Sequence, residues 1–74
     1  MDRVARIFIV DDHPIVRRGL ASLIELEPDL TVCGEADTLD GAARKIAELR
    51  PDLVIADLSL GQEDGTGLDR KRVV

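Results

Sequence analysis

The 74-residue chain has a mass of 8.1 kDa, so it forms at most one small domain, because compact domains usually run to roughly 100–150 residues. Hydrophobic residues make up 45% and charged residues 34%, with a mean hydropathy of +0.00, and this balance excludes disorder over the whole length. Fifteen acidic and ten basic side chains argue against direct binding of nucleic acid, and without a signal peptide or a membrane-length apolar run we expect a cytoplasmic protein with no membrane partner.

The first predicted strand covers residues 4–10 (VARIFIV), which are mostly β-branched or apolar. It ends abruptly at Asp11 and Asp12, as a strand buried on both faces does. A helix is predicted over about residues 14–27, because Pro14 suits a first helical position and Pro28 prevents continuation. Its apolar residues recur at helical spacing: Val16, Leu20, Leu23 and Ile24.

The second predicted strand covers residues 30–36 (LTVCGEA), although Gly34 is a poor strand former. Cys33 is the single cysteine, so it has no disulfide partner in the chain, and we expect it to pack as a small hydrophobe. A second helix is predicted over about residues 38–49, following an N-cap residue and ending before Pro51.

The third predicted strand covers residues 53–57 and ends at Asp57. A glycine-containing loop and a helix stub are expected over residues 58–74. Alternation of strands and helices predicts an α/β fold, in which parallel strands are joined by right-handed crossovers and helices cover both faces of the sheet.

Three carboxylates, those of Asp11, Asp12 and Asp57, follow or end predicted strands. The carboxyl ends of parallel strands form the usual ligand site of an open sheet. Carboxylates at one pocket rim repel one another unless a cation intervenes, and Mg²⁺ takes oxygen ligands together with phosphate. The residues alone leave two interpretations open: a Mg²⁺ site for phosphoryl chemistry, or solvated acids at strand ends and turns.

Two runs of sequence, IFIVDDHPIVRRGL at 7–20 and RPDLVIADLSL at 50–60, resemble the receiver domain of two-component response regulators. The DDHP-x-V-R-x-G-L pattern is most similar to the NarL/FixJ subfamily. The resemblance implies a flavodoxin-like parallel sheet, here truncated after the third strand. It covers most of this chain but only about the first half of a receiver domain.

The resemblance also implies the chemistry of the site. Asp57 would be the phosphoacceptor, Asp11 and Asp12 would hold Mg²⁺ together with Asp57, and Ser59 would add its backbone carbonyl to the metal. The partner would be a sensor histidine kinase, and DNA would be bound only through a C-terminal helix-turn-helix absent from this chain. We therefore expect a signalling domain of a transcription regulator that accepts a phosphoryl group on its own aspartate, rather than an enzyme.

Other residues near these motifs receive plainer interpretations. His13 and the pair Arg17 and Arg18 are expected to be solvated. The hydroxyl residue and the lysine with which receivers read the phosphoryl group do not occur in the matched part, and Gly61 stands where many receivers have proline. The chain by itself is therefore not expected to switch.

Two alternatives to a phosphoacceptor segment remain from the sequence. One is a metal-dependent phosphatase or phosphotransferase on a related α/β sheet, and the other is a remnant that only binds partners without switching. The sequence also predicts that the outer edge of strand 53–57 lacks a neighbour, which favours a homodimer or self-association through that strand.

Overall fold

The computed structural model describes residues 3–57 and the backbone of residues 71–73. The elements follow in the order β1 (Ala5–Val10), α1 (Pro14–Glu25), β2 (Leu30–Ala36), α2 (Leu39–Leu49), β3 (Leu53–Asp57) and β4 (Lys71–Val73). Neither helix in the described part of the chain is long and apolar enough to cross a membrane.

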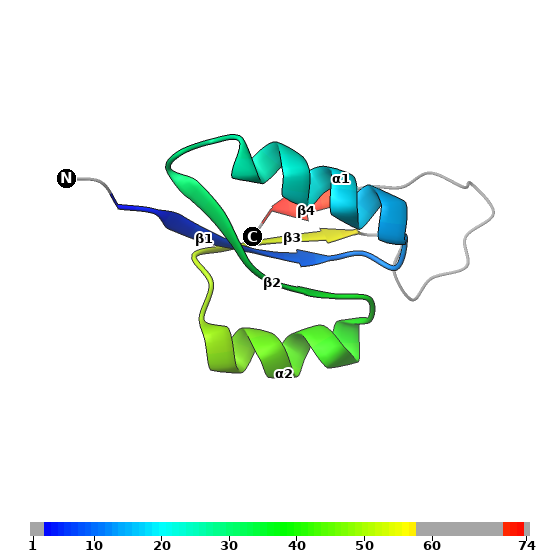
Figure 1. The fold of residues 1–74 in the computed structure, drawn as a ribbon. Coiled ribbons are helices and arrows are strands. Elements are labelled where there is room, and N and C mark those ends of the chain that lie inside the picture. The colour runs from blue at the N-terminus through cyan, green and yellow to red at the C-terminus, as the bar shows by residue number, and fades with distance from the viewer. Residues whose placement is uncertain (1–2, 58–70, 74) are drawn as a thin grey trace.

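The four strands form one sheet in the order β2-β1-β3-β4. β1 pairs in parallel with both β2 and β3, and its residues are the most deeply buried because it has a neighbour on each side. Helices α1 and α2 lie on opposite faces of the sheet (Figure 1). The predicted α/β fold, with parallel strands and helices on both faces, is confirmed.

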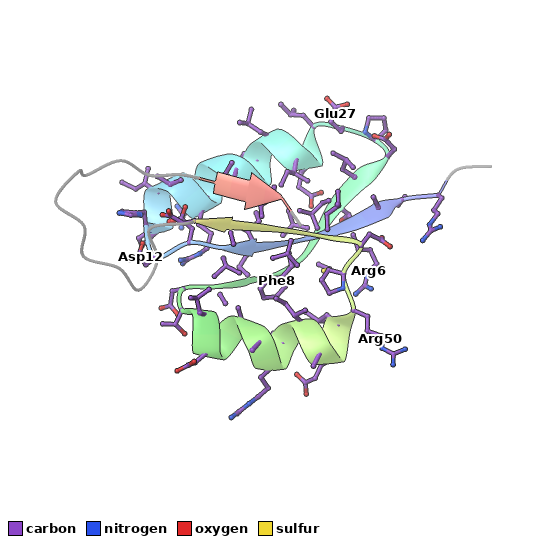
Figure 2. All side chains as sticks on the ribbon, turned by 180° about the vertical axis from the view of Figure 1, so that it is seen from behind. Arg6, Phe8, Asp12, Glu27 and Arg50 are labelled. Atoms are coloured by element: carbon purple, nitrogen blue, oxygen red, sulfur yellow. The ribbon has the colours of Figure 1, made fainter. Side chains whose placement is uncertain are left out.

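Two small apolar clusters hold the helices to the sheet. One side of β1 presents Ile7 and Ile9 to Ile24 of α1, and the other side presents Phe8 and Val10 to Ala42 of α2. Figure 2 shows the Phe8 ring between the sheet and α2. This alternation of side chains is the period-two pattern of a strand covered on both faces.

The helices begin and end for local reasons. Thr38 caps α2 by accepting a hydrogen bond from the backbone N–H of Gly41 at 3.0 Å. α1 ends at Glu25, two residues before the predicted bound, because Glu27 precedes Pro28 and that position disfavours helical backbone.

The end of the described chain differs from the sequence-based expectation. Residues 71–73 form strand β4, antiparallel to β3, rather than part of a helix stub, and the remaining residues of the expected loop and stub lie outside the described residues. Pairing with β4 satisfies backbone groups along the edge of β3 from Ile55 to Asp57, which an isolated stub of helix would leave exposed. The expectation that β3 lacks an outer neighbour is therefore wrong over these three residues.

Candidate functional site

Two buried carboxylates lie at the carboxyl ends of neighbouring strands. Asp11 follows β1 and Asp57 is the last residue of β3, and they are 0% and 2% exposed. The strands run parallel with Val10 opposite Ala56, so the residues that follow these two emerge at the same edge of the sheet. The fold thus holds two carboxyl groups in the protein interior, where a bound cation would favour their ionised form.

Two further residues, both more exposed than Asp11 and Asp57, complete the cluster. Asp12 and His13 lie at the rim, with side chains 52% and 49% exposed. One potential ligand atom from each of Asp11, Asp12, His13 and Asp57 lies within 4.8 Å of the others. Figure 2 shows Asp12 at the end of the sheet beyond β1. The structure therefore brings together all three carboxylates that the sequence places at the site, whereas Ser59 lies outside the described residues.

The backbone around Asp11 is tightly fixed. Its N–H donates to the carbonyl of Ala36 on β2 at 3.0 Å, and its Oδ1 accepts a hydrogen bond from the backbone N–H of His13 at 2.8 Å. A bond from a residue's side chain to the backbone two positions later is typical of an Asp-initiated turn. This turn directs the chain into Pro14, the first residue of α1, and leaves Asp12 and His13 at the rim.

The sequence predicts a solvated ring for His13, but in the structure the ring contacts three carboxylates. Its Nδ1 lies 3.0 Å from Oδ1 of Asp11, 2.9 Å from Oδ1 of Asp12 and 3.8 Å from Oδ2 of Asp57. The position directly after two acids was the available sequence signal. The direction of the ring could not be predicted from the sequence, because it depends on the turn at Asp11 and on the placement of β3.

Arg17 is a second residue that is expected from the sequence to be solvated but makes structural contacts. Its Nη1 donates to the backbone carbonyl of Asp11 at 2.6 Å, and its Nε donates to Oε1 of Glu35 at 2.9 Å. The guanidinium therefore links the end of β1, the first turns of α1 and strand β2. Arg18, in contrast, is exposed as expected.

The donor set suits a hard divalent cation. Carboxylate oxygens from Asp11, Asp12 and Asp57 are the ligands that Mg²⁺ prefers, and it is commonly held by one or two carboxylates with water and phosphate completing the shell. Asp12 and His13 are about half exposed, so among the described residues the cluster meets solvent at these two side chains.

Comparison with known proteins agrees with this arrangement. The sequence model of a protein family, described as the response regulator receiver domain, matches residues 7–71, which is most of the chain. The chain belongs to the response regulator receiver domain family. Asp11, Asp12 and Asp57 all lie within the matched residues.

Individual relatives extend well beyond this receiver segment. It is 39% identical over 66 residues to the DNA-binding transcriptional activator DevR/DosR of Mycobacterium tuberculosis, covering 89% of this chain and 30% of that protein. It is 39% identical over 61 residues to the nitrate/nitrite response regulator protein NarL of Escherichia coli K12, covering 82% and 28%. The chain therefore spans about a third of the length of the curated relatives it matches.

A solved relative supports the fold directly. The crystal structure of a LuxR-family two-component response regulator from Aurantimonas sp. SI85-9A1 superposes with a TM-score of 0.75 at 47% sequence identity. The match covers 82% of this receiver segment and 44% of that chain. At this identity the receiver-type fold and the NarL/LuxR kinship are both shown.

Proposed function

We propose that this chain is the phosphoacceptor segment of a two-component response regulator, and that a sensor histidine kinase phosphorylates it on Asp57. The observation that carries the proposal is the buried Asp57 carboxylate at the end of β3, clustered within 4.8 Å of Asp11 and Asp12. Membership of the receiver family supports it, because that family's members are signalling domains of regulators such as those matched here.

The proposed step is a direct phosphoryl transfer. An oxygen of the Asp57 carboxylate attacks the phosphorus, the bond between phosphorus and the donor atom breaks, and an acyl phosphate forms on Asp57. Asp11, Asp12, Asp57 and the backbone carbonyl of Ser59 would hold Mg²⁺, which when bound neutralises charge on the transferring oxygens. The contribution of the chain is positioning, because the ends of β1 and β3 hold the acids in a fixed arrangement.

The role of the whole protein belongs to the same proposal. DevR/DosR is described as a DNA-binding transcriptional activator, and this chain covers only 30% of it. We propose that the regulator to which this segment corresponds controls transcription in the cytoplasm through a separate helix-turn-helix domain. The receiver segment itself would contact the kinase rather than DNA, in keeping with its net charge of −5.

The decisive experiment is to incubate the chain with Mg²⁺ and a small phosphodonor such as acetyl phosphate, and to locate the added group by mass spectrometry. Wild type should gain one phosphoryl group on Asp57, removable by hydroxylamine as expected of an acyl phosphate. Asp57→Asn should gain none, because an amide oxygen is a poor nucleophile. Asp29→Asn, which changes an exposed carboxylate outside the cluster, should be labelled like wild type.

Two results would contradict the proposal. One is a label that persists in Asp57→Asn or that maps to His13. The other is repeated turnover of p-nitrophenyl phosphate, with many phosphates released per chain, because that behaviour would indicate the alternative of a metal-dependent phosphatase.

A further inference from the structure

The imidazole of His13 lies within the carboxylate cluster, where it is positioned to bind an ion. We infer that Nδ1 of His13 is a direct metal ligand, and that this nitrogen makes the site bind borderline divalent cations such as Zn²⁺ and Co²⁺ in competition with Mg²⁺. The inference rests on the proposed metal site and adds to it a ligand and a class of ion.

The distances around His13 match those of ligands that share one ion. Ligand atoms lie about 2.0–2.2 Å from Zn²⁺ or Mg²⁺. In an octahedral shell such as that of Mg²⁺, two ligands at right angles are then about 3 Å apart and two opposite ligands about 4.2 Å apart, whereas the tetrahedral shell usual for Zn²⁺ places ligands about 3.3–3.4 Å apart. Nδ1 of His13 is 3.0, 2.9 and 3.8 Å from carboxylate oxygens of Asp11, Asp12 and Asp57. Without an ion the ring is held there by a hydrogen bond to Asp11 and by ion-pair contacts, and the same three separations match those of ligands in an octahedral shell.

The local backbone holds the ring close to this position. His13 is the N-cap residue of α1, its N–H is bound to Oδ1 of Asp11, and Pro14 restricts the next φ angle. Only the two side-chain torsions remain to be ordered when an ion binds, so little conformational entropy is lost. The ring is 49% exposed, so an ion can reach Nδ1 from solvent.

The mixed donor set determines the selectivity. Carboxylate oxygens alone suit Mg²⁺, whereas imidazole nitrogen suits Zn²⁺, Co²⁺ and Ni²⁺ and gains little with Mg²⁺. Cys33, the other residue that these ions favour, packs against the Phe8 cluster between the sheet and α2 and is not part of the carboxylate cluster. Selectivity at this site is therefore assigned to His13 alone.

The test uses the chain as it is, which contains a single histidine and so gives one unambiguous set of ring signals. We would record ¹H–¹⁵N spectra of the ring during titration with Zn²⁺, and measure Co²⁺ and Mg²⁺ affinities by calorimetry for wild type and His13→Ala. The side chain of His13 makes no capping hydrogen bond to α1, so alanine should leave the helix intact, and circular dichroism checks this.

We expect Zn²⁺ to shift the Nδ1 resonance to the range of a coordinated nitrogen. We also expect His13→Ala to weaken Co²⁺ binding by at least about 10- to 100-fold, the loss typical of removing even an indirect partner of a metal ligand, while Mg²⁺ affinity changes little. The inference is overturned if Nδ1 keeps its shift when Zn²⁺ binds, or if His13→Ala leaves Co²⁺ affinity unchanged.

Asp57→Asn separates this inference from the proposed function. If that variant loses Mg²⁺ affinity and phosphoryl labelling while His13→Ala leaves Co²⁺ binding intact, the proposed function stands and only the role of His13 is refuted. If Co²⁺ binding requires His13 but wild type accepts no phosphoryl group on Asp57, the metal ligand is supported and the proposed function fails.

Discussion

Asp52 illustrates how a single exposed residue can connect two parts of the chain. Its Oδ2 accepts a hydrogen bond from the backbone N–H of Arg6 at 2.8 Å, and its Oδ1 lies 3.3 Å from Nη2 of Arg3. The bond from Arg6 is the main cause that lowers the pKa of Asp52 from its ordinary value of 3.8, and the charge of Arg3 adds to it. The carboxylate therefore joins the start of β1 to the residue before β3.

This lowered pKa predicts a pH-dependent contribution to stability. A carboxyl group whose pKa is lower in the folded chain stabilises the fold above its unfolded pKa, and this contribution is lost as the pH falls through the folded pKa. Asp52→Asn should lower the free energy of unfolding at neutral pH, and the difference from wild type should shrink as the pH falls below 3.8. Urea unfolding of both proteins across this range provides the measurement.

Arg3→Gln is the matched control for Asp52. It removes the charge and the side-chain hydrogen bond of Arg3 and leaves the backbone N–H of Arg6, the largest single cause, in place, so the pH dependence should be reduced but not abolished. A gap between wild type and Asp52→Asn that stays constant with pH would show that the charge of Asp52 has no such effect.

At the scale of elements, strand β2 tolerates a glycine because of how α2 packs on it. A Cβ atom added at Gly34 would lie 2.8 Å from Cδ1 of Leu49 and 2.9 Å from Cε2 of Phe8. The Phe8 ring is fully buried and cannot move away easily. The pairing with β1 also shifts at this point, because Ile7 lies opposite Val32 and Phe8 lies opposite Gly34.

Gly34→Ala should therefore destabilise the chain by about 1–3 kcal/mol, the usual cost of adding volume to a packed interior. Gly19→Ala is the matched control, because nothing lies within 4 Å of the added Cβ and the residue is inside α1. That control should stabilise by about 0.5–1 kcal/mol, as expected of alanine for glycine within a helix. Thermal or urea unfolding of both variants measures the change in stability. Equal effects of the two substitutions would show that contact with Phe8 is not the reason for glycine at position 34.

For the molecule as a whole, the outer edges of β2 and β3, the two strands that flank β1, are covered in different ways. Along β2, Oε2 of Glu25 accepts a hydrogen bond from the N–H of Val32 at 2.8 Å, and Nζ of Lys45 donates to the carbonyl of Glu35 at 3.1 Å. Along β3, the cover is strand β4. Side chains along β2, and on the other side an edge strand of only three residues, limit edge-to-edge pairing with a second chain.

Removal of residues 71–74 should therefore promote self-association. Without β4, the backbone groups of Ile55 to Asp57 face solvent on an apolar strand, which favours pairing with another copy. Sedimentation velocity over a wide concentration range should show a larger increase in average mass for the shortened chain than for the intact one. Identical behaviour of the two chains would show that β4 does not protect this edge.

The sequence by itself determined the features that depend on local pattern. Runs of apolar residues mark β1, β2 and β3, prolines bound the helices, and Asp11 and Asp57 come together because parallel strands end at the same edge. These inferences need only the nature of neighbouring residues and the handedness of the connections.

The tertiary structure decided what depends on partners distant along the chain. Arg17 is held by Glu35, 18 positions away, the ring of His13 approaches Asp57 on another strand, and Gly34 is required by Leu49 and Phe8. The three-residue strand β4 likewise exists as a strand through pairing with β3, whereas its own sequence has too few residues to specify one. In each case the deciding contact is made across the fold, where local propensity carries no information.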